Sequence, residues 1–384
     1  MPQRKLMIPG PVDITDEVRE AMAIPTMPHY GQEWIVLQGE TREMAKQVFG
    51  TRHDLYILAG PGTMALEAAL GSALEPGESV LVPNNGFFAA RLIHILKGLN
   101  LVPVEVKAPM GQPVLAAEVA ATLEAHPEVR VLALVHHETS TGVLNPLEEI
   151  AEVARDHELL TVVDAVSSLG GVPLPVDEWG IDFCVSVANK ALETPPGLAL
   201  LSISPRAWEQ IEAREAPRGW YLDLKTWRWY EENWGDWHPS PVTMPTSNLY
   251  ALHESLITLL EEGVERRYAE YRRAAQAVRR GLEALGFAML TEDTYASPLT
   301  TAFLMCPGVE AEGLKCWLCD EEQIMISGGI GDLKGKILRV GHIGLARRKD
   351  YVIAFLLGVE DYLRSLGREV QRGAGLVALT ESGF

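Results

Sequence analysis

The chain has 384 residues, of which 47% are apolar, and a formal net charge of −19 at pH 7. This length and apolar content allow two packed domains, whereas the acidic charge disfavours nucleic acid and anionic membranes as partners. We therefore expect a soluble globular protein, in which small anions can still bind locally.

Targeting signals and metal motifs are weak in this sequence. The segment before Pro9 lacks the apolar stretch of a signal peptide, and no run approaches the roughly 18 apolar residues of a transmembrane span. Four cysteines are too few for a disulfide scaffold, so we predict a cytoplasmic location. Cys316 and Cys319 have CxxC spacing but lie in an apolar helical pattern without a second pair, so we expect packing and no metal.

From about residue 54 to residue 201, short apolar runs alternate with helical patterns. Runs of consecutive Val, Leu and Ile are typical of strands buried on both faces. In chain order these runs are LYILA, SVLVPN, LVPVEV, VRVLALVH, LLTVVDAV, DFCVSVA and LALLSI. We predict an α/β fold whose large domain, residues 1–255 including an N-terminal arm, has a mostly parallel sheet flanked by helices.

The second half of the chain has a different pattern. Residues 217–248 are rich in tryptophan and proline and predict a long irregular excursion. A long helical pattern follows over residues 249–286, and shorter strand and helix patterns follow it. We predict a smaller α+β C-terminal domain, residues 256–384, which begins with this long connecting helix.

The segment after the first strand predicts a phosphate site. Gly60-Pro61-Gly62-Thr63 opens a helix, and a helix N-terminus with exposed amides binds anions. With Ala65 the segment also matches the dinucleotide fingerprint GxGxxA. The acidic residue that a nicotinamide site needs after the next strand is missing, because Asn84-Asn85 stands there. A dehydrogenase is therefore disfavoured.

Three further strand ends carry polar side chains. HHETSTG, residues 136–142, offers hydroxyl groups and lacks the spacing of a metal site, so we place His136 and His137 at the edge of the site. Asp164 follows LLTVV, and Lys190 follows DFCVSVA. Carboxyl ends of parallel strands meet at one edge of a sheet, so these groups are expected to lie close together.

A phosphate cradle, a buried carboxylate and a strand-end lysine are together what pyridoxal phosphate requires. The lysine binds the cofactor as an imine, the carboxylate keeps the pyridine nitrogen protonated, and the helix N-terminus holds the phosphate. A buried ammonium is costly, so Lys190 is better explained by this chemistry than as a structural residue.

These residues resemble the class V aminotransferases of fold type I, most closely the alanine–glyoxylate and serine–pyruvate group. The resemblance extends from residue 8 to about residue 365 and rests on PGPV, GPGTMALEAAL, NGFFAAR, HHETSTGVLNPL, VVDAVSSLGGVPL, ANKALETPPG, TMPTSNLYALHESL and RVGHIG. It implies a transaminase that uses pyridoxal phosphate and acts by a ping-pong mechanism. The implied donor is alanine or serine, and the implied acceptor is glyoxylate or pyruvate.

The resemblance also implies roles for individual residues. Lys190 and Asp164 would be catalytic, and Arg339 with Gly10 would bind the substrate, its carboxylate held by Arg339. The implied cofactor-binding residues are Gly62, Thr63, Phe88, Thr139, Asp164, Asn189, Lys190 and Thr243. Phe88 would stack on the ring, Thr139 would lie near its hydroxyl, and Thr243 would reach the phosphate of a neighbouring subunit, which implies a homodimer with shared active sites.

Three positions depart from the family pattern: Pro61 and Ser240 replace a common serine and tyrosine, and Asn189 replaces a common glutamine. The phosphate site is therefore expected to be rebuilt. Alternatives within the family are a 2-aminoethylphosphonate or pyridoxamine transaminase and a cysteine desulfurase-like lyase. The sequence shows no evident second cation beside Arg339 and Phe88, which disfavours a dicarboxylate substrate.

Overall fold

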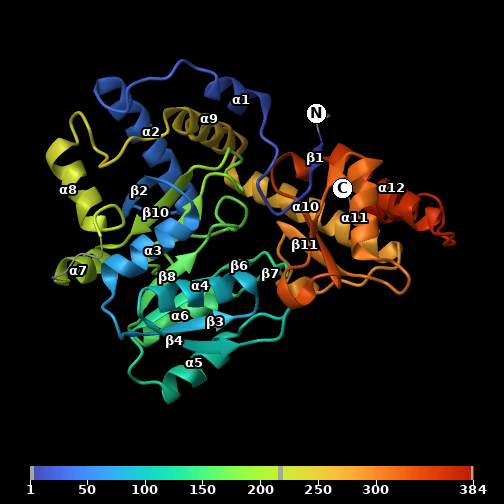
Figure 1. The fold of residues 1–384 in the computed structure, drawn as a ribbon, viewed down its shortest axis with the longest axis horizontal. Coiled ribbons are helices and arrows are strands. Elements are labelled where there is room, and N and C mark those ends of the chain that lie inside the picture. Colours follow the sequence, from blue (N-terminus) through green and yellow to red (C-terminus); the bar gives the residue numbers. More distant parts are fainter. Residues whose placement is uncertain (1–3, 215–218, 382–383) are drawn as a thin grey trace.

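The computed structural model describes residues 4–214, 219–381 and 384. A seven-stranded sheet forms the centre of the larger part of the molecule (Figure 1). In spatial order its strands are β2 (Asp54–Ala59), β10 (Leu198–Ile203), β9 (Phe183–Val187), β8 (Leu160–Asp164), β5 (Val131–Val135), β3 (Ser79–Asn84) and β4 (Val102–Lys107). All seven apolar runs are thus strands, as predicted.

The sheet is mostly parallel, which confirms the expected fold class. Strands β9, β8, β5, β3 and β4 pair in parallel, whereas β10 is antiparallel to both β2 and β9. This reversal arises because only residues 188–197 join β9 to β10, too few for the crossover that parallel strands need. The register pairs Asp164 with Val135 and with Val185, so several strands end at the same edge.

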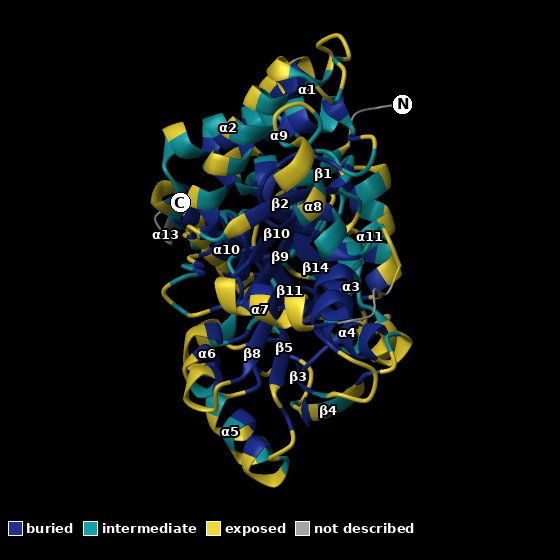
Figure 2. Cartoon of the chain, turned by 90° about the vertical axis from the view of Figure 1, so that its left-hand side faces the viewer, coloured by how far each residue is buried: buried dark blue, intermediate teal, exposed yellow. Residues whose placement is uncertain are grey.

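Helices flank this sheet, and their outer faces are exposed, whereas its strands are mostly buried except for the edge strand β4 (Figure 2). They are α1 (Asp16–Met22), α2 (Gln32–Phe49), α3 (Gly62–Ala73), α4 (Phe87–Gly98), α5 (Ala116–Ala125), α6 (Leu147–Asp156), α7 (Pro205–Ala213), α8 (Leu224–Trp234) and α9 (Thr246–Glu262). A short hairpin of β6 (His137–Glu138) and β7 (Val143–Leu144) follows β5.

The described residues of the C-terminal part form a small sheet and four helices. The strands of this sheet are, in spatial order, β11 (Thr300–Leu304), β14 (Ile337–Gly341) and β13 (Ser327–Gly328). A separate two-stranded sheet pairs β1 (Lys5–Leu6) with β12 (Ile324–Met325). The helices are α10 (Val264–Ala284), α11 (Ala311–Asp320), α12 (Lys349–Ser365) and α13 (Ala374–Glu381), with the 3₁₀ turns η1 (Asp293–Tyr295), η2 (Gly331–Leu333) and η3 (Gly344–Arg347).

The long helical pattern is two helices, α9 and α10, which meet at Gly263. Gly263 has φ 87°, a left-handed conformation that glycine adopts without strain. Leu249 and Leu259 of α9 pack in the core of the large sheet, whereas Val278 and Leu282 of α10 pack in a second core. We propose Gly263 as the start of the smaller domain, in place of the boundary at residue 255.

Two local expectations are wrong. Residues 217 and 218 lie outside the described part, but the excursion after them is partly helical, because Asp223 caps α8 by accepting a hydrogen bond from the N–H of Lys225 at 2.9 Å. The CxxC pair is on α11, as expected, but Cys316 is exposed, and the buried residues of this helix are Ala311, Leu314 and Leu318. No helix within the described ranges has the length and apolar character to cross a membrane.

Candidate active site

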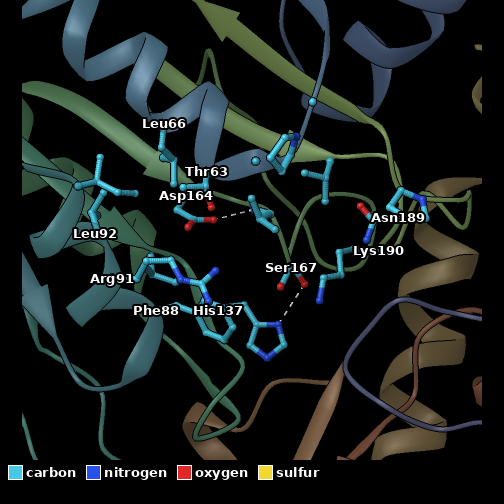
Figure 3. A pocket seen from close by; sticks show the side chains of 18 of the residues that line it. Thr63, Leu66, Phe88, Arg91, Leu92, His137, Asp164, Ser167, Asn189 and Lys190 are labelled. Carbon is cyan, nitrogen blue, oxygen red and sulfur yellow. Dashed lines mark hydrogen bonds between the residues drawn. The ribbon is translucent and has the colours of Figure 1, made fainter. Parts of the chain in front are cut away.

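A cavity of about 490 Å³ opens at the edge where the parallel strands end (Figure 3). It lies between the N-terminal ends of α3 and α4 and the segment that joins β9 to β10. Six of the residues proposed from the sequence line it: Gly62, Thr63, Phe88, Asp164, Asn189 and Lys190. The structure thus brings together residues from four separate segments of the chain.

Lys190 lies three residues beyond the end of β9 and meets the N-terminal arm. Its Nζ donates a hydrogen bond to the carbonyl oxygen of Pro9 at 2.5 Å. Gly10 has φ 117°, and a Cβ added there would lie 2.5 Å from the same Nζ. Gly10 therefore allows the arm to approach the lysine closely, and its expected contact with substrate stays a prediction.

The lysine amine is easier to deprotonate than usual. Burial, and then the positive charge of Arg339, lower the pKa of Lys190 to about 8, although the charge of Asp164 acts in the opposite direction. At pH 7 roughly a tenth of such amines are neutral, far more than for an exposed lysine. Lys190 can therefore serve as a nucleophile and as a base.

Asp164 ends β8 and places its carboxyl group in the cavity. Its Oδ1 accepts a hydrogen bond from the N–H of Val166 at 3.0 Å. Burial raises the pKa of Asp164 to about 6; the Val166 N–H opposes this rise, and the charge of Glu138 adds to it. A cationic N–H placed opposite the carboxyl group would stabilise its charged form.

The N-terminus of α3 forms another wall of the cavity. Within the described residues no side chain caps this helix, whose N-cap is Pro61. A Cβ on Gly62 would lie 2.6 Å from Cγ2 of Val166 and 3.0 Å from Cγ1 of Val187, so glycine lets the helix start against the ends of β8 and β9. The positive end of the helix dipole therefore faces the cavity, where an anion would be stabilised.

Glu138 was missed as a functional residue by the sequence analysis. Its buried carboxylate accepts hydrogen bonds from the N–H groups of Phe88 at 2.9 Å and Ala89 at 3.0 Å, and from the hydroxyl of Ser140 at 2.5 Å. It thereby fixes the first turn of α4 and the position of Phe88. The only signal was its place among the hydroxyl residues of HHETSTG.

Arg91 was also missed, and it corrects the statement that no second cation is near. It lies one turn after Phe88 on α4, lines the cavity and places its guanidinium 4.8 Å from the centre of the Phe88 ring. It makes no ion pair with any residue that the structure describes. The i, i+3 spacing from Phe88 was the available signal, because it places both on one face of a helix.

Arg339 and Thr139 contact each other, and neither is among the residues that line the cavity. The guanidinium of Arg339, on β14, donates from Nη1 to the carbonyl oxygen of Thr139 at 2.9 Å and from Nε to that of Gly328 at 3.0 Å. Burial lowers the pKa of Arg339 to about 10. The contact between these two residues is made by the backbone of Thr139. The expected contact of Thr139 with the ring hydroxyl of a cofactor stays a prediction.

Comparison with known proteins decides the family. The model of the family "Aminotransferase class-V" matches residues 15–333. The chain belongs to the class V aminotransferases.

Three relatives illustrate the range of this family. This chain is 36% identical in sequence to alanine–glyoxylate aminotransferase of Callithrix jacchus. The match covers 92% of this chain and 86% of that protein. The chain is 30% identical to ureidoglycine–glyoxylate aminotransferase of Bacillus subtilis, with TM-score 0.94 over 100% and 98% of the two chains. It is 30% identical to pyridoxamine–pyruvate aminotransferase of Mesorhizobium loti, with TM-score 0.92 over 98% and 96%.

Class V aminotransferases depend on pyridoxal phosphate, and the cavity fits this cofactor. The uncapped N-terminus of α3 could bind the phosphate, and the carboxyl group of Asp164 could pair with the protonated ring nitrogen. Lys190 could bond to the aldehyde carbon. Phe88 lines the same cavity and offers a ring face. When bound, the cofactor supplies an electron sink for the bonds at the substrate Cα.

Thr243 is not part of this arrangement within one chain of the aminotransferase. It is exposed in the segment between α8 and α9 and is not among the residues that line the cavity. Ser240 beside it is buried. The predicted contact between Thr243 and a neighbouring subunit therefore stays a prediction.

Proposed function

We propose that this aminotransferase moves the amino group of alanine or serine to glyoxylate or pyruvate by a ping-pong mechanism. The observation that carries the proposal is the buried guanidinium of Arg339. It donates hydrogen bonds to two backbone carbonyl oxygens, and its positive charge lowers the pKa of Lys190. A planar guanidinium binds one α-carboxylate with two parallel hydrogen bonds. Similarity to alanine–glyoxylate aminotransferase supports the same substrate class.

In this proposal each residue has one task. Arg339 orients the substrate carboxylate, and Asp164 accepts a hydrogen bond from the cationic ring nitrogen. Lys190 Nζ removes the proton from the substrate Cα and returns a proton to complete the transfer. Glu138 and the first turn of α4 keep Phe88 in position, so that the reacting group stays aligned with Nζ.

Arg91 favours a second candidate, an amino donor with two carboxylates. Its guanidinium lines the same cavity as Lys190 and has no ion-pair partner among the described residues. A second carboxylate on the substrate would supply that partner. The lyase alternative has less support, since the exposed Cys316 lies on α11 and is not part of the cavity wall.

A panel of amino donors tests the proposal. Alanine, serine, aspartate, glutamate, pyridoxamine and 2-aminoethylphosphonate are mixed singly with the holoenzyme, and the cofactor spectrum is followed in a single turnover. We expect alanine and serine to react fastest, with amino groups recovered on glyoxylate or pyruvate. Faster reaction with aspartate or glutamate, and loss of that preference in Arg91→Gln, would instead establish the second candidate.

A further inference from the structure

A second cavity, of about 400 Å³, lies between the two domains and shares no lining residue with the active-site cavity. One of its walls is a face of α10. Another includes Leu144 of β7 and Val172 from the segment after β8, and a third is the stretch from η1 to Pro298. The volume is within the range of small-molecule sites. The proposed reaction assigns no ligand to this interdomain cavity.

Backbone contacts hold the walls of the interdomain cavity together. The N–H of Ser297 donates a hydrogen bond to the carbonyl oxygen of Gly142 at 2.9 Å, and Val143 pairs with Ala296 in an antiparallel bridge. The β6–β7 hairpin of the large domain thus contacts the smaller domain (Figure 1). Because the cavity is formed before any ligand binds, little ordering of the chain opposes binding.

The wall of this cavity is positively charged, although the chain as a whole has a formal net charge of −19. Arg272, Arg279 and Arg280 of α10 line it. Asp293 is the one acidic side chain of the wall within the described part of the chain, so three guanidinium groups face one carboxylate there. An anion that enters the cavity is therefore attracted to it, whereas most of this acidic molecule repels anions.

Two of these arginines retain N–H groups that a ligand can use. Arg279 is 7% exposed and is fixed in the wall, since its Nε donates to Oδ1 of Asp293 at 2.8 Å and its Nη2 to the carbonyl oxygen of Thr291 at 2.8 Å. Arg272 is exposed and has neither an ion pair nor a hydrogen bond with any residue that the structure describes. The seven-residue spacing places both on one face of α10. Arg272 is thus an accessible cation beside a fixed one.

The rest of the lining is mostly apolar and includes Leu144, Val172 and Ala275. Apolar surface of a ligand that packs there is removed from water, which favours binding. We propose that the interdomain cavity binds a small organic acid, whose carboxylate pairs with Arg272 and whose apolar body packs against Leu144 and Val172. A guanidinium pairs with a carboxylate through charge-assisted hydrogen bonds, and the charge of Arg279 adds to the attraction. This inference goes beyond the proposed function and does not depend on it.

Titration calorimetry with 4-phenylbutyrate tests the proposal, because this probe has one carboxylate and an apolar body. The holoenzyme should bind it with a Kd of about 1 mM or lower. The neutral analogue 4-phenylbutanol lacks the charge and should bind about 5-fold more weakly or worse, and acetate lacks the apolar body and should give no measurable heat at the same concentrations.

Two variants locate the bound probe. Arg272→Gln removes the accessible cation at an exposed position and should weaken binding of 4-phenylbutyrate by about 5- to 10-fold. Ala275→Leu fills the cavity from α10 and should weaken it by about 10-fold or more. Arg273→Gln is the matched control, because Arg273 is adjacent, exposed and outside this cavity wall, and it should leave the Kd unchanged.

Each alternative result overturns the inference. No binding of 4-phenylbutyrate to the wild type does so, and so does equal binding of 4-phenylbutanol. An unchanged Kd in Arg272→Gln, or an equal loss in Arg273→Gln, would show that the probe binds elsewhere, including the active site. Melting temperatures of all variants are compared with the wild type, so that a general loss of structure in Ala275→Leu is recognised and Arg272→Gln decides.

Discussion

At the scale of single residues, the account depends on charges that are buried beside one another. Lys190, Asp164 and Arg339 are within electrostatic reach, and burial is the main cause of each pKa shift. A buried ammonium costs stability in the folded state unless it is neutralised. The same feature that prepares Lys190 for chemistry should therefore destabilise the protein when no cofactor is bound.

This cost predicts the pH dependence of the cofactor-free protein. The folded pKa of Lys190, about 8, is below the usual value for lysine of about 10.4, so the penalty is complete below pH 8 and vanishes as the pH rises toward 10.4. Lys190→Met should be more stable than wild type at pH 7, by up to about 3 kcal/mol, with a smaller difference at pH 9. Urea unfolding at several pH values measures this.

The control for that measurement is Lys97→Met, at an exposed position on α4. Its effect on the free energy of unfolding should be small and nearly independent of pH between 7 and 9. An advantage of Lys190→Met that is absent at pH 7, or that grows as the pH rises, would show that Lys190 is not a buried ammonium in the cofactor-free protein.

Arg339 gives a second prediction at this scale. Its Nε and Nη1 hold two carbonyl oxygens, and a lysine cannot reproduce this planar geometry. Arg339→Lys should lower kcat/KM for amino donor and oxo-acid acceptor alike, by about 2–4 kcal/mol of transition-state binding. The cofactor absorbance should stay normal. Unchanged rates in the amino-acid half-reaction would remove Arg339 from the substrate site.

At the scale of elements, the segment between β9 and β10 is anchored to the smaller domain by Glu193. This residue has φ 53°, uncommon for a residue other than glycine. Its Oε1 accepts hydrogen bonds from Arg267 at 2.6 Å, Arg347 at 2.7 Å and the hydroxyl of Tyr271 at 2.8 Å. The segment that carries Lys190 is thus tied to α10 and η3.

Removing this anchor should be costly. In Glu193→Ala, Arg267 and Arg347 lose one of their buried carboxylates, and we expect a loss of about 3–5 kcal/mol in the free energy of unfolding. Glu283→Ala is the control, since it breaks only the exposed pair with Arg280 and should cost about 1 kcal/mol or less. Equal losses in urea unfolding at the same protein concentration would contradict the role of Glu193.

Much of this element structure was predictable from residue patterns. The seven strands were recognised because buried parallel strands are continuous apolar runs. The position of Lys190 and Asp164 at the edge of the sheet was predictable because each follows such a run. The division of the long helix at Gly263 was missed because one glycine interrupts the helical periodicity only weakly. Helix α8 was missed because its tryptophans suggested an irregular segment, although Asp223 was an available capping signal.

The rest of the site depends on tertiary contacts that no local pattern contains. The approach of Gly10 to Lys190 joins residues 180 positions apart in the chain, and the contact of Arg339 with Thr139 joins residues 200 apart. Glu138 was hidden in the sequence because its partners, the amides of α4, belong to another segment. Long-range placement of this kind is set by the packing of the whole fold.

At the scale of the whole molecule, the aromatic surface around α8 predicts a homodimer. Exposed rings gather there and on the neighbouring arm: Tyr30, Trp220, Trp229, Trp234 and Trp237. An exposed apolar patch of this kind usually marks an interface, and Thr243 lies in the same part of the chain. We predict a dimer in which Thr243 reaches the phosphate site of the partner subunit.

Sedimentation velocity tests the dimer, with activity measured on the same samples. Trp229→Arg should shift the protein toward a less active monomer, whereas Trp208→Phe, at a buried position on α7, should leave the association unchanged. Thr243→Ala should weaken cofactor binding without dissociating the dimer. A fully active wild-type monomer would exclude shared active sites.

The central claim is that Lys190 is the residue that binds the cofactor, and peptide mapping tests it most directly. The holoenzyme is reduced with borohydride, digested, and its peptides are examined by mass spectrometry for the attached cofactor. The account predicts the label on Lys190 alone and no fixed label in a folded Lys190→Ala variant. A label on another lysine, or an equally labelled Lys190→Ala protein, would contradict the account.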